Sequence, residues 1–362
     1  MSFGGNQNFQ SFPEPQLMTE SQRTMFVLVN RLVLCTAIGL FGLVTNLINM
    51  AVFVKLGFKI SMNISLFTLS FWDFIRIILV QWLNVCSNPL LTRPDVPVLF
   101  SDVQYLTAGW PSNCAIRITM SIAAYITFER CLGIMAPLKI RNIITPSKTV
   151  FILNIITIIN IGGILPEYVS AYYDWKYNTL RNRTVLSLTF NMYRPATQGV
   201  AFGIHSVFIF LDLFLLIIFT SVLVAQLRRK SKWRHEKVRD ESQRASLSGR
   251  DKKTCKLVVL LATLLVLCYS PVVILSAVTG LRPDISFAGK ENNLFHSLWS
   301  FAYLLGVFNA SINSFIYYNM SSKYKEQFWF MFSRIMFKTK QESLPRIQTI
   351  KLSSYSLSSS SN

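Results

Sequence analysis

Seven apolar segments, each long enough to cross a lipid bilayer, constrain this chain more than any other feature of its sequence. They cover roughly residues 32–54, 62–83, 106–135, 150–169, 199–227, 257–281 and 294–318. A bilayer core about 30 Å thick needs about 20 apolar helical residues, because each residue rises only ~1.5 Å. Lipid offers no hydrogen bonds to the backbone, so a spanning segment must pair its own polar groups. The sequence therefore predicts an all-α membrane protein built as a seven-transmembrane helix bundle.

The composition agrees with a membrane setting. Hydrophobic residues make up 51% of the chain and charged residues only 15%, whereas soluble domains are about a quarter charged. The formal net charge is +19, and a basic balance suits either nucleic acid or the surface of a membrane. Because the basic residues stand between the apolar segments, we expect the lipid bilayer as a partner and no nucleic acid.

The connections between the apolar segments differ in their content of Lys and Arg. Residues 228–253 are dense in both, as are residues 55–59, 139–148 and 323–340, whereas the alternate connections hold fewer and nearly as many acids. Cytoplasmic connections carry the excess of Lys and Arg. The sequence therefore predicts a multi-pass protein of the plasma membrane with its N-terminus outside and its C-terminus in the cytoplasm.

These patterns divide the chain into four parts. We expect residues 1–26 to form an extracellular tail, residues 27–320 the seven-helix bundle, residues 321–335 an amphipathic helix along the membrane surface, and residues 336–362 a disordered Ser-rich cytoplasmic tail. One outer connection contains the glycosylation sequon Asn182-Arg183-Thr184. This sequon is either glycosylated or an unused tripeptide.

Charged residues inside the apolar segments need a partner or a purpose, because each costs about 2.5–3.5 kcal/mol on insertion scales. Asp73 and Arg76 stand three residues apart in the second segment, which places them close to the same helix face. Arg117 lies in the third segment and Asp212 in the fifth. For this second pair we expect a structural ion pair.

Five of the segments contain short motifs. They are Thr45-Asn46 in the first, Leu69-x-x-x-Asp73 in the second, Glu129-Arg130-Cys131 at the inner end of the third, Cys268-Tyr269-Ser270-Pro271 in the sixth and Asn313-Ser314-Phe315-Ile316-Tyr317 in the seventh. With these motifs the chain resembles the rhodopsin-like (class A) G-protein-coupled receptors over about residues 36–332, whose own motifs read Gly-Asn, Leu-x-x-x-Asp, Asp-Arg-Tyr, Cys-Trp-x-Pro and Asn-Pro-x-x-Tyr. Each motif alone is weak, but their order and placement together are specific.

The resemblance implies coupling to a heterotrimeric G protein through Arg130. Glu129 can hold this arginine near the inner membrane face by a charge-assisted hydrogen bond. The resemblance places Asp251 at the inner end of the sixth segment as a second partner, so that release of Arg130 would open a cleft for the G protein. Alternatively, Asp251 belongs only to the mixed-charge connection around it.

Four residues are implied as activation switches. Pro271 removes a backbone hydrogen bond and would kink the sixth segment. Tyr269, in the place of the usual Trp, would sense the ligand, or it is a packing aromatic. Asn313 and Tyr317 belong to the motif of the seventh segment, where Ser314 replaces the proline of the family.

A sodium site is also implied by the resemblance. Asp73, Thr119, Asn309 and Asn313 match positions where the family builds a polar cluster for this ion, and a hard cation prefers such oxygen ligands. Arg76 could supply the counter-charge instead. Beyond this ion we expect no cofactor and no metal.

The ligand is constrained chiefly by two substitutions. Ser112 stands where amine receptors of the family carry a carboxylate, and Val307 stands where opsins carry their lysine, which argues against a monoamine and excludes retinal. The expected pocket residues are Trp82, Trp110, Asn113, Arg117, His205, Tyr269, Trp299 and Tyr303. They suit a small chemical or a short peptide, although each aromatic could equally be a packing or interfacial residue. Arg117 would attract an acidic group if Asp212 does not neutralise it.

The family normally joins the outer end of its third helix to the following outer loop by a disulfide. Here Tyr105 occupies the helix position, and residues 169–198 contain no cysteine. Pairing of Cys86 with Cys114 is an alternative that we do not expect, because Cys114 lies well inside its segment. We therefore expect a less constrained outer loop.

At a finer level, residues 109–131 resemble the chemosensory receptor sets of invertebrates, particularly molluscs, with neuropeptide receptors as the alternative. A transporter would also explain charges inside the membrane, but transporters usually contain paired repeats, and none is visible in the sequence. We expect no enzyme, since no nucleophile–base arrangement is present. Phosphorylation of serines in residues 353–361 would attract an arrestin after the action of a receptor kinase.

Overall fold

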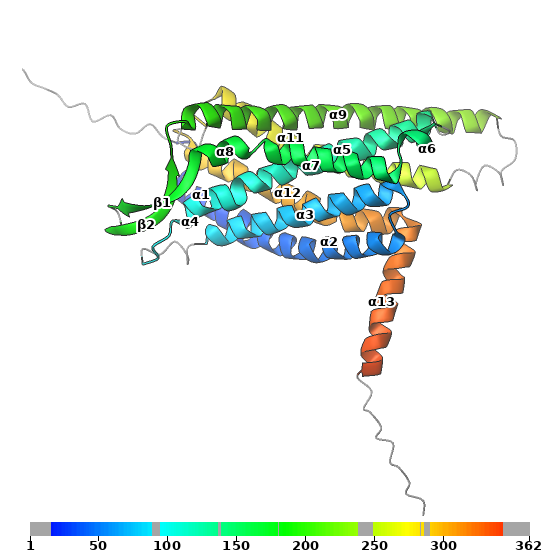
Figure 1. Cartoon of the computed structure of the whole chain (residues 1–362), viewed down its shortest axis with the longest axis horizontal. Coiled ribbons are helices and arrows are strands. Elements are labelled where there is room, and N and C mark those ends of the chain that lie inside the picture. Colours follow the sequence, from blue (N-terminus) through cyan, green and yellow to red (C-terminus); the bar gives the residue numbers. More distant parts are fainter. Residues whose placement is uncertain are drawn as a thin grey trace, which may run out of the picture.

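The fold is described from a computed structural model of the whole chain (Figure 1). The structure describes residues 16–88, 95–136, 139–179, 181–237, 249–282, 284–285 and 290–342. The serines of the C-terminal tail lie outside these residues.

The first span is one helical rod made of three consecutive elements, α1 (Glu20–Val27), η1 (Leu28–Cys35) and α2 (Thr36–Leu56). Thr19 and Gln22 form a capping box that starts α1, so helical structure begins inside the stretch that we expected to be a tail. Gly57 ends α2 with a φ of 79°, a left-handed conformation that glycine adopts at little cost.

The other elements include the helices that hold the predicted segments, together with a pair of strands and short helices that the sequence did not predict. They are α3 (Ser61–Cys86), α4 (Phe100–Gln104), η2 (Tyr105–Gly109), α5 (Trp110–Met135), α6 (Ile140–Ile143), α7 (Pro146–Gly162), α8 (Leu165–Ser170), β1 (Ala171–Asn178), β2 (Arg183–Phe190), α9 (Arg194–Lys237), α11 (Gly249–Leu281), α12 (Asn292–Met320) and α13 (Ser322–Glu342). The fourth predicted segment is divided between α7 and α8.

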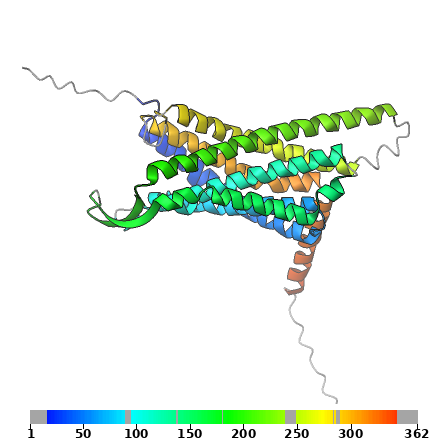
Figure 2. The same cartoon turned by 45° about the horizontal axis from the view of Figure 1, so that its top comes forward.

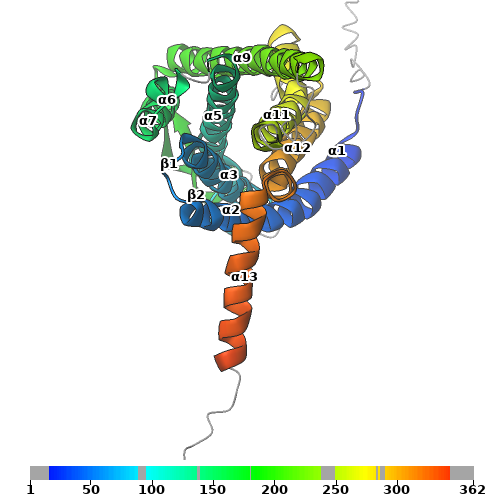
Figure 3. The same ribbon diagram turned by 90° about the vertical axis from the view of Figure 1, so that its right-hand side faces the viewer.

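Six of the described helical stretches are long and apolar enough to cross a membrane. The seventh predicted segment lies in α12, which has 29 residues but carries many polar side chains. These are buried at Asn293, Ser297, Ser300, Asn309, Ser311 and Asn313. Since α12 packs against α2, α3 and α11 and lies within the ring of helices (Figure 3), the predicted seven-helix membrane bundle is confirmed.

The two ends of the bundle differ. At one end, β1 and β2 form an antiparallel hairpin in which Ala171 faces Phe190 and Asn178 faces Arg183. At the other end, α13 leaves the bundle (Figures 1 and 2). We call these the hairpin end and the α13 end.

Helix α13 runs across the long axis of the bundle (Figure 1), as expected of a helix that lies along a membrane surface. Tyr324 anchors it, since this side chain is 1% exposed and its hydroxyl donates to Asn49 Oδ1 at 2.6 Å. Trp329 and Phe330 are exposed, which suits contact with lipid. The helix continues to Glu342, beyond the boundary at residue 335 that we expected, because the sequence has no Gly or Pro to stop it there.

Small residues allow α2 and α12 to pack closely. Asn46 Nδ2 donates to the carbonyl oxygens of Gly42 and Ala310 at 2.9 Å each. A Cβ atom added at Gly42 would lie 2.1 Å from Ser311 Oγ and 2.7 Å from Ile77 Cδ1. No larger residue fits at this position without displacing α12 or α3.

We therefore expect Gly42→Ala to destabilise the protein by about 1–3 kcal/mol, the usual cost of overpacking. The measurement is the thermal unfolding midpoint of the detergent-solubilised chain. Gly203→Ala is the matched control, because a Cβ atom there meets nothing within 4 Å. Equal midpoints for the two variants would contradict the packing of α2 against α12 and α3.

Candidate functional site

A buried carboxylate lies at the centre of a polar cluster formed by three helices. Asp73 on α3 has 0% exposure. It accepts hydrogen bonds from Asn313 Nδ2 on α12 at 2.7 Å and from Thr119 Oγ1 on α5 at 3.5 Å. Asn309, the fourth residue of the predicted sodium cluster, is buried on α12. The structure thus joins three of the four predicted residues by hydrogen bonds.

The guanidinium of Arg76 is directed to α11 and α12. Its Nη1 atom donates to the hydroxyl of Tyr269 and to the carbonyl oxygen of Gly306, the latter at 2.7 Å. A Cβ atom at position 306 would lie 1.8 Å from Arg76 Nη2, so glycine is what admits the guanidinium. This contact between Arg76 and the predicted sensor Tyr269 was missed by the sequence analysis, although the charge in the second segment was its signal.

The residues of the predicted coupling site lie near the end of α5. Arg130 Nη2 donates to Glu129 Oε1 at 2.8 Å, and Glu129 is 3% exposed. The expected contact between these two neighbours is therefore present. Asp251 belongs to α11, but its side chain lies outside the part of the chain that the structure describes.

The remaining activation residues lie on α11 and α12. Pro271 lies inside the helix α11. Tyr317 is 1% exposed, and its ring packs edge-on against Phe53 at a centroid distance of 5.3 Å and beside Tyr324 at 5.8 Å. It therefore connects the span α12 with the surface helix α13.

The prediction of an ion pair between Arg117 and Asp212 is wrong. Arg117 Nη2 donates to the carbonyl oxygen of Asn160 on α7 at 2.7 Å, and Asp212 Oδ2 accepts from Ser121 Oγ at 2.7 Å. Among the described residues, ion pairs join Arg23 to Glu20, Arg130 to Glu129 and Arg194 to Glu167. The break between α7 and α8 brings a backbone carbonyl within reach of Arg117, which spacing along the sequence could not reveal.

The predicted pocket residues fall into several groups. Trp110 packs against His205 of α9 at a ring distance of 6.3 Å, and Trp299 packs against Tyr303 within α12 at 6.4 Å. Asn113 is half-buried one turn from Trp110. Trp82 stands apart, because it is 37% exposed and its indole donates to Thr107 Oγ1 at 2.8 Å.

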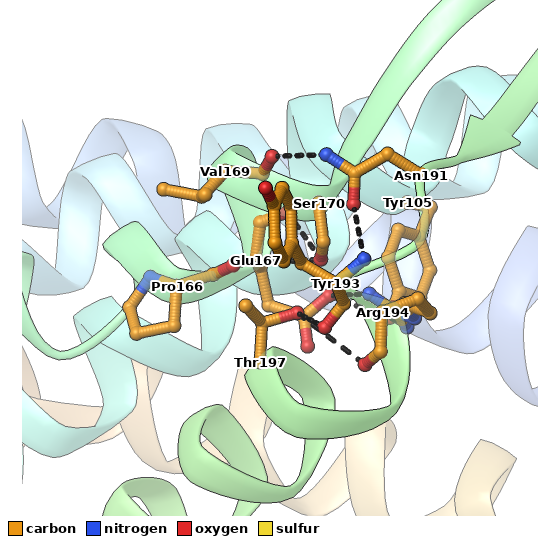
Figure 4. A network of polar contacts seen from close by, with 9 residues as sticks. All are labelled: Tyr105, Pro166, Glu167, Val169, Ser170, Asn191, Tyr193, Arg194 and Thr197. Carbon is orange, nitrogen blue, oxygen red and sulfur yellow. Dashed lines mark hydrogen bonds and ion pairs between the residues drawn. The ribbon is translucent and has the colours of Figure 1, made fainter.

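At the hairpin end, a buried network joins three elements (Figure 4). Arg194 at the start of α9 pairs with Glu167 of α8, and its Nη2 atom donates to the hydroxyl of Tyr105 at 2.7 Å. That hydroxyl donates to Glu167 Oε2 at 3.1 Å, and Glu167 is fully buried. Burial lowers the pKa of Arg194, but the hydrogen bonds to Glu167 and Tyr105 raise it by more than burial lowers it. The pKa of Arg194 is therefore above its ordinary value.

The hairpin itself is hydrogen-bonded to the segment before α5. Leu99 N donates to Leu186 O at 3.0 Å, and Leu186 N donates to Pro97 O at 2.9 Å. Asp102 accepts from Leu188 N at 3.1 Å. The expectation of a less constrained outer loop is therefore wrong.

Noncovalent contacts hold this loop, where the rhodopsin-like receptors that the sequence resembles have a disulfide. Tyr105 occupies the very position of the expected cysteine and is part of the buried network. Cys86 and Cys114 are both buried and free, as expected. At the tip of the hairpin, Asn182 has a φ of 49° and an exposed side chain, so the sequon is accessible.

Comparison with protein families matches most of the chain. The family model described as "Serpentine type 7TM GPCR chemoreceptor Srw" matches residues 33–335, which is more than half of the chain and includes every spanning helix in whole or in large part. No curated protein matches the chain.

The buried network at the hairpin end predicts strongly non-additive substitutions. Arg194→Met leaves the buried carboxylate of Glu167 without its cation, a change that costs about 3–5 kcal/mol in buried pairs. Adding Glu167→Gln to this variant removes the orphaned charge and should restore much of the thermal midpoint. A double variant whose loss equals the sum of the two single losses would contradict the coupling of these residues.

Proposed function

This chain belongs to the Srw family of serpentine seven-transmembrane chemoreceptors, and we propose that it binds an extracellular small chemical and activates a heterotrimeric G protein. The observation that carries the proposal is that the family model covers most of the bundle, including the Glu129–Arg130 pair. The family is one of G-protein-coupled receptors and not a class of enzymes.

The proposed orientation places the hairpin end outside the cell and the α13 end in the cytoplasm. Two features support it. The dense run of Lys and Arg in residues 228–253 begins in the last turns of α9, whose C-terminal end lies at the α13 end (Figure 1), and cytoplasmic connections carry such an excess. The accessible sequon of Asn182 lies at the hairpin tip, where an extracellular loop could be glycosylated. The plasma membrane is the compartment in which this orientation exposes the receptor to external chemicals.

The buried polar contacts suggest how a signal crosses the bundle. Tyr269 lies in one apolar cluster with Ile116 of α5 and with Trp299 of α12, so a ligand at the hairpin half can displace it. Its hydroxyl accepts a hydrogen bond from Arg76, and Arg76 also donates to the carbonyl oxygen of Gly306 on α12. Movement of Tyr269 therefore changes the contacts among α3, α11 and α12.

At the α13 end, the proposal assigns the transducing role to Arg130. In the resting state Glu129 holds its guanidinium, and the sequence resemblance adds Asp251 as a second partner on α11. Activation releases Arg130 and moves α11 outward about Pro271, while Asn313 and Tyr317 rearrange on α12. The freed arginine then packs against the G protein.

Several finer assignments belong to this proposal. The motifs of the spans support descent from the rhodopsin-like class, and residues 109–131 resemble molluscan chemosensory receptors; a neuropeptide receptor of the same fold is the alternative. The serines of the tail would recruit a receptor kinase and an arrestin. A transporter is the alternative from another class, and ligand-dependent nucleotide exchange without substrate flux separates the two.

Asp73 also suggests regulation by sodium. The oxygen atoms of Asp73 and Thr119 suit this ion, and Asn309 and Asn313 would complete its cluster. Arg76 competes with the ion, because its guanidinium, on the same helix as Asp73, already supplies positive charge near that carboxylate. Replacing sodium by choline should therefore alter ligand affinity only if the ion enters the cluster.

The central test is Arg130→Ala in membranes that contain a purified heterotrimer. We expect ligand-free nucleotide exchange to fall at least about tenfold while surface expression persists, because the side chain that contacts the G protein is lost. Arg23→Ala is the matched control, since it breaks the Arg23–Glu20 pair at the hairpin end. Unchanged exchange in the Arg130→Ala variant would contradict the proposal.

The proposed clamp on Arg130 makes a separate prediction. Asp251→Ala should raise ligand-free exchange several-fold, because it removes one of the two carboxylates that restrain Arg130. Lys252→Ala, the neighbouring substitution, should leave this basal exchange as it is. If the Asp251→Ala variant has the basal exchange of the unaltered chain, Asp251 is no clamp.

A further inference from the structure

A fully buried arginine in α5 forms no ion pair with any residue that the structure describes. Arg117 has 0% exposure, and its Nη2 atom donates to Asn160 O at 2.7 Å. Its Nε and Nη1 atoms have no hydrogen-bond partner among the residues that the structure describes. Asp212, the expected partner, uses its carboxylate to accept from Ser121 at 2.7 Å.

The other buried arginines of the bundle are better satisfied. Arg194 pairs with Glu167 and bonds to Tyr105, and Arg76 donates to a hydroxyl and a carbonyl. A buried charge without an anion is costly. The free Nε–H or Nη1–H of Arg117, together with the second N–H of Nη2, makes a fork whose geometry matches a carboxylate.

The surroundings of Arg117 fit an organic acid. His205 Nδ1 is buried without a hydrogen-bond partner among the described residues, and it offers a second polar contact. The Phe208 ring lies 5.8 Å from the guanidinium carbon, and Phe202 packs edge-on against Trp110 at 5.1 Å. Gly163 makes room, since a Cβ atom there would lie 3.2 Å from Arg117 Nη2.

We propose that Arg117 binds the carboxylate of a monocarboxylic acid whose apolar body packs against the aromatic side chains of α5 and α9. The proposal rests on the proposed function and names the class of its ligand. A single carboxylate is favoured over a doubly charged group because Arg117 supplies one positive charge.

Binding can be measured without a G protein, on the purified full chain in detergent. The probes are straight-chain and phenyl-substituted monocarboxylic acids, each compared with its own primary amide. A ligand that binds only the folded chain stabilises it by RT ln(1 + [L]/Kd), where [L] is the free ligand concentration, and so raises the thermal midpoint. We expect at least one acid to raise the midpoint and its amide to have no effect. Arg117→Gln should lower the affinity for that acid at least about tenfold.

Three controls test whether Arg117 itself holds the carboxylate. Arg31→Gln removes another arginine of the bundle, which lies over the Tyr303 ring, and should leave acid binding intact. Without ligand, Arg117→Gln should not lower the midpoint, because it removes an uncompensated charge. If this variant does not fold, Arg117→Lys keeps the charge but loses the fork, and it should bind the acid several-fold more weakly while still rejecting the amide.

The contrary outcomes are equally definite. If no acid shifts the midpoint, if acids and amides shift it equally, or if Arg117→Gln keeps full acid binding, the proposal is wrong. A shift by chloride over gluconate that Arg117→Gln abolishes would assign the position to an inorganic ion instead. Since no G protein is present, failure here is separate from failure of the exchange assay.

Discussion

Lipid accepts no hydrogen bonds, and every polar group inside the bundle must therefore find its partner within the protein. Asp73 meets this requirement through Asn313 and Thr119, and Arg76 meets it through Tyr269 and Gly306. These contacts join α3 to α5, α11 and α12. The same need that holds the helices together thus creates a connection between the half of the bundle that would meet a ligand and the half that would meet a G protein.

The pattern of the sequence predicted the parts of the structure that depend on local properties. Long apolar runs predicted all seven spans, including the one in α12, where buried polar side chains interrupt the apolar run. The contact between neighbours Glu129 and Arg130 was also foreseen, because adjacent residues at a helix end have few alternatives. The surface helix was predicted from its amphipathic pattern, though its end was not.

Contacts between distant residues could not be predicted in the same way. Arg76 and Tyr269 are 193 positions apart, and they meet only because the fold lets the long Arg76 side chain reach from α3 to α11. Arg117 and Asp212 were expected to pair because their charges are opposite. Instead, Arg117 donates to a backbone carbonyl oxygen and Asp212 accepts from a serine hydroxyl. The missing disulfide suggested a loose outer loop, yet Glu167, Arg194 and the hairpin backbone constrain it by noncovalent means.

The link between Tyr269 and Arg76 is the centre of this account, and basal nucleotide exchange tests it most directly. Tyr269→Phe removes only the hydroxyl that holds Arg76 to α11. Tyr168→Phe is the comparison, because it loses a hydrogen bond of 2.6 Å to Leu106 O away from the connection. We predict that Tyr269→Phe raises ligand-free exchange several-fold while Tyr168→Phe does not. Equal basal exchange in both variants and the unaltered chain would contradict the account.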